Sequence, residues 1–355
     1  MLPFVYNALP ARVIFGTGTL AQVVQELRNL GCSRAVVLTT PHQVEQGKAV
    51  KNLLGDLCVG LYTKATMHTP TDITDAAVSA VQELHADCLV AVGGGSTIGL
   101  GKAIALRTDL PQIVVPTTYA GSEATPIIGQ TEDGVKTTQK TLKVLPEVIV
   151  YDVDLTLTLP SKMSVTSGVN AIAHAVEALY SKEANPVVNL LAQEGIKAIA
   201  SALPIIIHER DTPSLREARS GALYGAWACG TCLGAVGMSL HHKLCHTLGG
   251  TFNLPHAETH TVILPHAIAY NTPYAADAIA KVASSLGVTN AAQGIFDLAK
   301  TLGGPYSLKE LGMKEADLEK AADIAVRSPY PNPAPLEREK LLELLRNAWA
   351  GTRPE

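Results

Sequence analysis

Residues 88–105 read CLVAVGGGSTIGLGKAIA, and this stretch decides the fold. Its first five residues are all apolar, as in a strand buried on both faces of a parallel sheet. Three glycines and a serine follow, and the sequence then becomes compatible with a helix. A strand that runs through glycines into a helix predicts a phosphate-binding turn, because backbone N–H groups and the helix dipole attract an anion. The ordinary alternative is a tight turn that needs glycine for its backbone angles.

The same alternation extends to both sides of the glycine turn. Short apolar runs occupy residues 34–38, 112–116 and 147–152, and amphipathic stretches with plausible N-caps begin at Thr19 and Thr71. Alternating strands and helices predict a doubly wound α/β domain.

The sequence pattern changes after Pro160. Strand-like runs become rare there, and long Ala- and Gly-rich helical stretches dominate. We therefore expect an α/β nucleotide-binding domain over residues 1–160 and an all-helical substrate domain over residues 161–355. The proline-rich residues 328–337 predict an extended connector before a last helix.

Small polar residues follow several of the predicted strands, and in α/β sheets ligands bind at the carboxyl ends of strands. Residues 116–123 read PTTYAGSE, and residues 38–40 read LTT. An acid near such a strand end commonly selects NAD by holding the ribose 2′-OH, whereas threonine is compatible with NADH and NADPH. The candidate cofactor-binding residues are Thr39, Gly93, Gly94, Gly95, Ser96, Thr97, Thr117, Thr118, Tyr119 and Ser122.

Composition excludes several classes of protein. The chain has 355 residues, a net charge of −4 and no basic block, which argues against a nucleic-acid partner. No signal peptide is expected, and no uninterrupted apolar run approaches the roughly 18 residues of a membrane helix. Six cysteines in so long a chain favour reduced thiols in a cytoplasmic protein. The pair Cys229-Gly-Thr-Cys232 lies in an Ala/Gly-rich stretch and favours helix packing over redox chemistry.

The helical half carries a pattern of histidines. Asn170 and His174 are four residues apart, as are His242 and His246, so each pair shares a helix face. His256 follows a proline in what reads as a short loop. Each histidine alone could be structural, whereas the set resembles a metal site or a polar catalytic pocket. The amide of Asn170 weakens the metal interpretation, because neutral ligands do not offset a divalent charge.

These residues resemble the iron-containing alcohol dehydrogenase family. The match spans essentially the whole chain in order, through residues 12–18, 93–105, 116–123, 168–180 and 241–271. The resemblance implies a dehydroquinate synthase-like fold, an α/β nucleotide domain followed by an all-helical domain, and a homodimer or larger oligomer. In the family's metal enzymes the metal ligands align with Asn170, His174, His242 and His256.

Departures from the family pattern point to one branch. Asn170 and Gly99 stand where aspartate is usual, and residues 116–123 lack the common PTTAGTGSE form. With RSPYPNP at residues 327–333, these variants resemble the branch that reduces the carbon–carbon double bond of maleylacetate, late in aromatic-compound degradation, with NADH or NADPH. The resemblance therefore implies a small dicarboxylate substrate and no required metal.

The chemistry of that reaction suggests roles for the polar pocket. Hydride addition beside a ketone produces an enolate, which needs a hydrogen-bond donor on oxygen and an acid for carbon. His174, His242 and His256, next to Asn170, are assigned to substrate and enolate binding, and His246 is the candidate proton donor. Three alternatives stay open: an iron- or zinc-dependent alcohol or glycerol dehydrogenase, a metal-dependent lyase, and a nucleotide-binding protein without catalysis.

Overall fold

The computed structural model describes residues 3–132, 135–209, 212–327 and 330–355. The chain divides into two compact units, each packed mainly against itself. We call Leu9–Thr118 with Ser122–Leu159 the sheet unit. We call Met1–Ala8, Tyr119–Gly121 and Pro160–Glu355 the helical unit.

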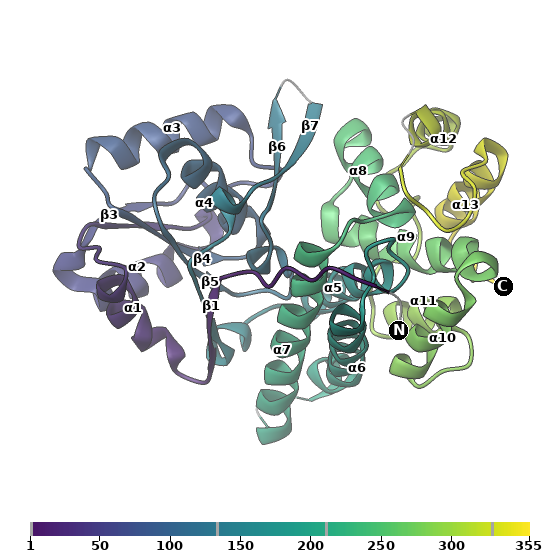
Figure 1. Cartoon of the computed structure of the whole chain (residues 1–355), viewed down its shortest axis with the longest axis horizontal. Helices are drawn as coiled ribbons and strands as arrows, with labels where there is room; N and C mark the ends of the chain where they lie inside the picture. Colours follow the sequence, from purple (N-terminus) through teal and green to yellow (C-terminus); the bar gives the residue numbers. More distant parts are fainter. Residues whose placement is uncertain (1–2, 133–134, 210–211, 328–329) are drawn as a thin grey trace. The chain divides into compact units, whose positions relative to one another are not determined.

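The sheet unit is built on a six-stranded parallel sheet in the order β1-β8-β5-β4-β2-β3 (Figure 1). Its strands are β1 (Arg12–Gly16), β2 (Ala35–Leu38), β3 (Cys58–Tyr62), β4 (Cys88–Gly93), β5 (Gln112–Pro116) and β8 (Val148–Asp152). Its helices are α1 (Val23–Asn29), α2 (Val44–Leu54), α3 (Thr71–Glu83) and α4 (Gly95–Thr108). The α/β fold predicted for the N-terminal half is confirmed.

Helices cover both faces of the sheet. Val23 and Leu27 of α1 join Val50 of α2 in a buried cluster on one face. Ala77 of α3 and Ile104 of α4 belong to the cluster on the other face. Strands buried on both sides explain why β2, β4, β5 and β8 read as uninterrupted apolar runs.

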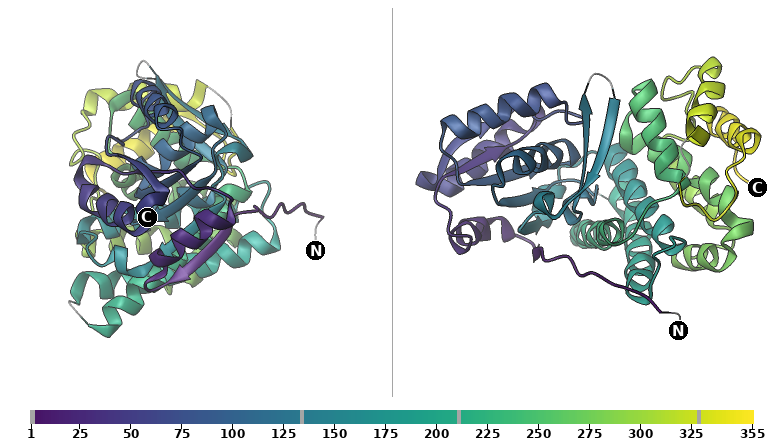
Figure 2. Two further views of the ribbon diagram at one scale, coloured as in Figure 1. Left: turned by 90° about the vertical axis from the view of Figure 1, so that its left-hand side faces the viewer. Right: turned by 45° about the horizontal axis from the view of Figure 1, so that its top comes forward.

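Four strands were not predicted. The edge strands β1 and β3 are half-exposed, so their sequences lack a continuous apolar run. The other two, β6 (Ile127–Glu132) and β7 (Val135–Lys140), form a separate antiparallel ribbon (Figure 2). The predicted N-caps Thr19 and Thr71 are wrong, because Gly18 and Pro70 precede the first helical residues.

The helical unit contains no strand among the residues described after β8. Its helices are α5 (Ser161–Leu179), α6 (Pro186–His208), α7 (Pro213–Ala235), α8 (Leu240–Phe252), α9 (His256–Asn271), α10 (Ala276–Leu286), α11 (Ala291–Thr301), α12 (Leu318–Arg327) and α13 (Arg338–Ala350). Helix α5 is buried along nearly its whole length and packs against α6, α7 and α9. The stretch that reads as one helix over residues 216–250 is two, because the chain leaves α7 and re-enters a helix at Leu240.

One helix of this unit is long and apolar enough to cross a membrane by length and composition. It is α6, with a mean hydropathy of 1.5 over its most apolar window, of which 39% is buried. Helices α7 and α8 pass the same test together but meet at a 95° bend. Helix α6 passes this test by mean hydropathy although Glu194 and Lys197 interrupt its apolar run. Core helices of soluble proteins meet the same criterion, so the finding is weak evidence for a span.

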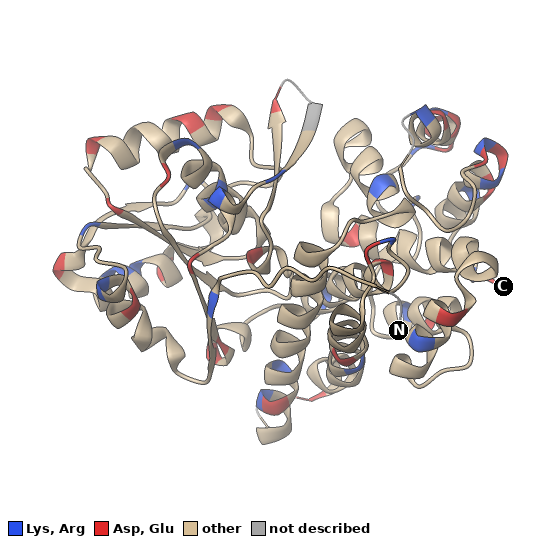
Figure 3. Ribbon diagram, in the orientation of Figure 1, with Lys and Arg blue, Asp and Glu red and all other residues tan. Residues whose placement is uncertain are grey.

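Charged residues of both signs are interspersed along the ribbon (Figure 3). The densest mixture lies on α12 and α13, where Arg338 pairs with Glu319, Asp323 and Glu339. These exposed pairs tie the two C-terminal helices together, although each contributes little on its own.

Candidate active site

The glycine turn joins β4 directly to α4, as the sequence predicted. Gly93 has a φ of +154°, and a Cβ atom there would lie 2.5 Å from Thr97 Oγ1. At Gly94 a Cβ atom would lie 2.9 Å from the Thr118 side chain. Both positions therefore require glycine so that β4, α4 and the segment after β5 can approach closely.

The first turn of α4 is suited to an anion. A Cβ atom at Gly95 would meet nothing within 4 Å, so space is open beside the helix N-terminus. The buried hydroxyl of Thr97 has no hydrogen-bond partner among the described residues. The first N–H groups of a helix also lack intrahelical acceptors. Gly95, Ser96 and Thr97 can thus supply donors to a phosphate.

The carboxyl ends of β2 and β5 are linked by a residue that sequence reasoning missed. Gln43 donates from Nε2 to Thr117 Oγ1 at 3.0 Å and accepts from the Thr40 hydroxyl at 3.3 Å. Thr39, a predicted cofactor residue, is fully buried, and its hydroxyl donates to the Gln43 carbonyl. Thr39 therefore stabilises the loop after β2 through this hydrogen bond. Gln43 lies beside the glycine turn.

The segment after β5 is held by a buried lysine. Lys102 Nζ donates to the carbonyls of Ser122, Thr125 and Ile127 at 2.6–2.8 Å. Burial lowers the pKa of Lys102 to about 7, and nearby Glu123 opposes the shift. Ser122, another predicted cofactor residue, is thereby fixed in place through its main chain.

Tyr119 belongs to the helical unit, unlike the other predicted cofactor residues. It is fully buried, and its hydroxyl accepts a hydrogen bond from Arg219 Nη1 at 3.0 Å. Gly99, where the family pattern has aspartate, packs against Thr69, and a Cβ atom there would lie 2.4 Å from Thr69 Oγ1. The Thr69 hydroxyl therefore fills the space that an aspartate would use.

The helical unit gathers six histidines on three helices. They come from α5, from the N-terminal half of α8 and from the start of α9. Ring contacts join His174, His241, His242, His246, His256 and His260. We call these six residues the histidine cluster. Sequence spacing found four of them and missed His241 and His260.

Glu177 is the acid of this cluster, and sequence reasoning missed it as well. Its carboxylate is fully buried and accepts from the backbone N–H groups of Ser239 and His241, both at 2.8 Å. It also accepts from Tyr180 Oη and from His242 Nδ1, the latter at 2.7 Å. A carboxylate at the start of α8 is stabilised by the helix dipole and these donors. The sequence did contain a signal for Glu177: it follows His174 by three residues, about one helical turn, so the two side chains share a helix face.

A chain of hydrogen bonds runs from Glu177 across two imidazoles. Because the carboxylate accepts, His242 carries its hydrogen on Nδ1 and leaves the Nε2 lone pair for His174 Nδ1, 2.8 Å away. His174 therefore carries its hydrogen on Nδ1 and presents the Nε2 lone pair at its other end. Burial lowers the pKa of both histidines to about 3, which agrees with two neutral rings.

Asn170 closes this chain as a donor. Its Nδ2 lies 3.4 Å from His174 Nε2 and 3.3 Å from the Ala120 carbonyl oxygen. His174 Nε2 also lies 3.2 Å from the Ala120 carbonyl oxygen, which only accepts, so the amide of Asn170 supplies an N–H between these oxygen and nitrogen atoms that a carboxylate could not supply. All ring nitrogens of His174 and His242 are then engaged within the protein. The assignment of His174 and His242 to enolate binding stays a prediction. With the hydrogens placed in this way, neither ring has an N–H left to donate to an enolate.

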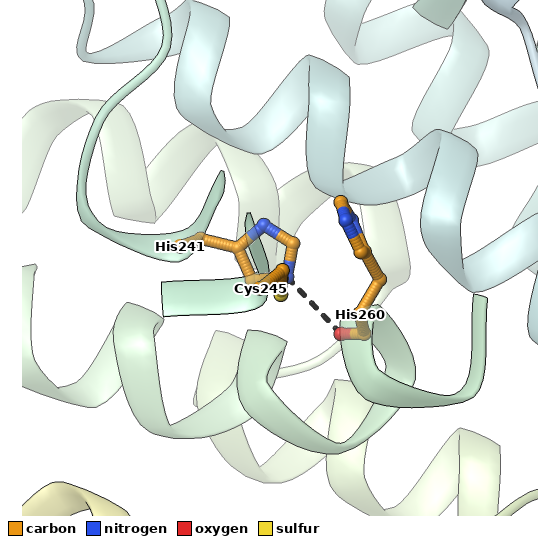
Figure 4. Close-up of side chains that lie close together, drawn as sticks. All are labelled: His241, Cys245 and His260. Atoms are coloured by element: carbon orange, nitrogen blue, oxygen red, sulfur yellow. Dashed lines mark hydrogen bonds between the residues drawn. The ribbon is translucent and has the colours of Figure 1, made fainter. Parts of the chain in front are cut away.

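His241, Cys245 and His260 lie together next to this chain (Figure 4). His241 Nε2 lies 3.1 Å from the His260 carbonyl oxygen, and its Nδ1 lies 3.4 Å from His242 Nδ1. Because His242 Nδ1 carries a hydrogen, His241 holds its own on Nε2 and donates it to the carbonyl. The Cys245 sulfur lies 3.6 Å from the same nitrogen.

The two remaining predicted histidines border the cluster. His246 lies one turn beyond His242 on α8, with ring centroids 6.2 Å apart. His256 is half-buried and is the first residue of α9, which corrects the expected loop position. Pro255 is the N-cap residue of α9 and has extended backbone angles, with φ −65° and ψ 134°.

Cys229 and Cys232 pack between helices, as predicted. Both are free and fully buried, and a Cβ atom at Gly195 of α6 would lie 2.6 Å from Cys229 Sγ. Burial raises the pKa of Cys232 to about 12 and raises that of Cys229 strongly. Neither thiol is therefore a nucleophile at neutral pH.

Comparison with known proteins places this geometry in a family. A model of iron-containing alcohol dehydrogenases matches residues 10–153, and the C-terminal model of the same family matches residues 164–349. The chain belongs to the iron-containing alcohol dehydrogenase family. Members are NAD(P)-dependent oxidoreductases, and this chain is accordingly an NAD(P)H-dependent oxidoreductase.

Similar members of the family span the whole chain. A maleylacetate reductase from Rhizobium sp. (strain MTP-10005) is 54% identical over 355 residues, covering 100% of both chains. The crystal structure of a maleylacetate reductase from Agrobacterium tumefaciens is 54% identical, with a TM-score of 0.94 and 100% coverage of both chains. An iron-containing alcohol dehydrogenase from Corynebacterium glutamicum ATCC 13032 is 39% identical, with a TM-score of 0.93, covering 100% of this chain and 99% of the other.

Two of the residues aligned with the family's metal ligands, His174 and His242, are hydrogen-bonded to each other here. His174 Nδ1 and His242 Nε2 are 2.8 Å apart and hydrogen-bonded. Two imidazole ligands on a tetrahedral ion lie about 3.3 Å apart, given bonds of roughly 2.0–2.1 Å. The Asn170 amide further directs an N–H toward His174 Nε2.

Two other ligand groups lie within the described residues, Glu177–His241–His242 and His241–Cys245–His260. Both need a lone pair from His241. Its Nδ1 faces the N–H of His242, and its Nε2 hydrogen points at a carbonyl. Both groups could hold a metal ion; with the hydrogens placed as above, His241 instead forms hydrogen bonds within the cluster.

Proposed function

We propose that this protein reduces the carbon–carbon double bond of maleylacetate to give 3-oxoadipate, with NADH or NADPH as hydride donor. The observation that carries the proposal is the identity of 54% with a curated maleylacetate reductase across the entire length of both chains.

We assign the cofactor to the glycine turn and the substrate to the histidine cluster. The glycine turn and the start of α4 would bind the pyrophosphate of the cofactor in the sheet unit. Hydride attacks the alkene carbon β to the ketone, and the π electrons move to the ketone oxygen as an enolate. The other alkene carbon then takes a proton, which completes 3-oxoadipate and leaves the oxidised cofactor. His246 remains the candidate proton donor, and His256 a candidate substrate ligand.

The charge of the cluster suits this substrate. Maleylacetate carries two carboxylates, and an aspartate at position 170 would add a negative charge facing it. Asn170 removes that repulsion and donates a hydrogen bond within the cluster. The Glu177 carboxylate accepts hydrogen bonds from the backbone N–H groups at the start of α8. These donors stabilise its negative charge without a metal ion.

We further propose that turnover requires no metal, because the chain's own hydrogen bonds occupy the positions that would hold one. The cofactor preference is open, since Thr39 and Thr40 end β2 without a carboxylate to exclude a 2′-phosphate. We also propose a cytoplasmic homodimer that binds no nucleic acid and no membrane; the mixed surface charge supports the absence of a nucleic-acid partner.

The test is NADH and NADPH oxidation by the purified protein with maleylacetate, with the product identified by NMR. We expect 3-oxoadipate in equal amount to the cofactor oxidised. Glycerol, ethanol and 1,3-propanediol with NAD⁺ serve as the comparison. Oxidation of these alcohols without reduction of maleylacetate would replace the proposal with a general alcohol dehydrogenase activity.

A further inference from the structure

One histidine of the cluster stands out because its ring nitrogens are left unsatisfied within the described part of the chain. His260 lies on α9 and is fully buried, and among the described residues neither Nδ1 nor Nε2 has a hydrogen-bond partner. A buried polar group without a hydrogen-bond partner destabilises the folded state. Native structures therefore contain few such groups, and each calls for a physical explanation, of which a ligand is one.

The position of His260 is central. Its ring centroid lies 4.2 Å from that of His256, 4.7 Å from His241, 5.1 Å from His242 and 6.2 Å from His174. His256 is half-exposed and lies against the His260 ring, so one imidazole separates His260 from the outside of the cluster.

The neighbours of His260 are already committed. His174 and His242 bond to each other, to Asn170 and to Glu177, and His241 donates to a carbonyl. A neutral imidazole keeps one N–H, and such a group can polarise a carbonyl oxygen without carrying a charge.

We propose that His260 is a further catalytic residue, whose N–H binds the ketone oxygen of an α,β-unsaturated keto-dicarboxylate and stabilises the enolate. This inference rests on the proposed function. Hydride from the reduced cofactor forms the new C–H bond, the double bond breaks, and its electron pair reaches the ketone oxygen, where His260 donates. A proton then bonds to the neighbouring carbon, and the electrons return to form the ketone.

The hydrogen bond from His260 would act mainly on the chemical step. A hydrogen bond to the oxygen strengthens as negative charge develops, so it accelerates the chemical step more than it tightens binding. Removing one such donor typically costs about 100–1000-fold in kcat. The loss should therefore appear in kcat, with KM and cofactor affinity nearly unchanged.

The experiment compares His260→Leu, His260→Gln and the control His266→Leu with the wild-type protein. His266 is another buried histidine of α9 and takes no part in the ring contacts of the cluster. With maleylacetate, we expect kcat of His260→Leu to fall about 100-fold or more. His260→Gln should recover at least about tenfold of that loss, because its amide also donates. The control should keep its kcat.

Several outcomes would overturn the inference while leaving the proposed function intact. One is a kcat for His260→Leu close to that of the wild type. Another is an equal loss in both His260 variants together with a lower Tm, which indicates packing alone. Absence of turnover in the wild type would instead refute the proposed function itself.

A measurement on the wild-type protein keeps the inference testable if the variants fail to fold. The protein is labelled with ¹⁵N-histidine and examined by NMR before and after addition of NAD⁺ and 3-oxoadipate. We expect a new downfield imidazole N–H signal when both are bound. An unchanged set of imidazole signals with both ligands bound would contradict a hydrogen bond from His260.

Discussion

The glycine turn and the histidine cluster differ in how they are assembled. The turn occupies one continuous stretch, in which Gly93, Gly95 and Thr97 follow one another from β4 into α4. The cluster joins side chains far apart in sequence, such as His174 and His242, which are 68 residues apart. A local motif shows its geometry in its residue order. For a site assembled from distant segments, the sequence indicates which residues share a helix face. It does not indicate which ring nitrogens remain free to bind a ligand.

The largest expected effect comes from breaking the cluster at Glu177. Glu177→Gln removes the charge that fixes the hydrogen of His242 on Nδ1, so both imidazoles can change tautomer. We expect kcat to fall on the order of 100–1000-fold and the unfolding free energy to drop by about 2–4 kcal/mol. Steady-state kinetics and urea unfolding measure the two effects.

The matched control is Glu183→Gln. Glu183 also accepts from a backbone N–H before α8, that of Gly237, but is exposed. It should change kcat little. Equal losses in both variants would show that Glu177 merely supports the start of α8.

Asn170→Asp tests whether the cluster depends on an amide. Aspartate cannot donate to His174 Nε2 or to the Ala120 carbonyl, and it faces the substrate with a negative charge. We expect kcat/KM for maleylacetate to fall about 10–100-fold. Asn170→Ala, which removes the donor without adding charge, should lose less. A more active Asn170→Asp that binds iron or zinc would contradict the amide's role.

The glycine turn can be broken in two distinguishable ways. Gly95→Ala adds a methyl group where nothing lies within 4 Å, so the fold should remain as stable while the Kd for NADH rises about tenfold. Gly93→Ala places the same methyl group 2.5 Å from Thr97 Oγ1 and should lower the unfolding free energy by about 1–3 kcal/mol. Fluorescence titration and urea unfolding separate the effects. An unchanged Kd in Gly95→Ala would exclude a phosphate at that position.

The buried histidines predict loss of stability in acid. Burial lowers the pKa of His241 to about 3 and that of His266 to about 4, from about 6.5 in the unfolded chain. The unfolded state therefore binds more protons below pH 6.5. Each such histidine stabilises the fold fully above that pH, and its contribution is lost as the pH falls toward the folded value. The slope is about 1.4 kcal/mol per pH unit for each group.

His266→Gln isolates one of these groups outside the cluster. Between pH 4 and 6.5 its unfolding free energy should decline less steeply than that of the wild type, by about one proton. Urea unfolding at several pH values measures the slope. Identical slopes would mean that His266 is already protonated in the folded protein.

The smallest effect is expected at the cysteine pair. Cys229→Ala with Cys232→Ala removes two buried, protonated thiols that contact α6. The kcat should stay within about twofold, because packing changes remote from the reacting groups act mainly on stability. A large loss of kcat with an unchanged Tm would reveal a chemical role for the pair.

Much of the fold was predictable because local sequence patterns determine it. Strands buried on both faces gave continuous apolar runs, and helix-compatible stretches marked most of the second half. The half-exposed edge strands lacked that signal, and the break between α7 and α8 was hidden by helix-forming residues.

The site was predictable only in part. Helical spacing and the family resemblance identified four candidate residues: His174, His242, His246 and His256. Glu177 and His260 were missed, because a single acid within a helix and a histidine beside threonines are ordinary features of a sequence. Their importance depends on burial and on which neighbours already use their hydrogen bonds.

The most direct test of the central claim is the rate of maleylacetate reduction as a function of metal content. The protein is dialysed against a strong chelator, its residual iron and zinc are measured by mass spectrometry, and either metal is then restored stepwise. A rate per chain that is independent of bound metal is the predicted result. A rate proportional to bound iron or zinc would contradict a cluster that works through its own hydrogen bonds.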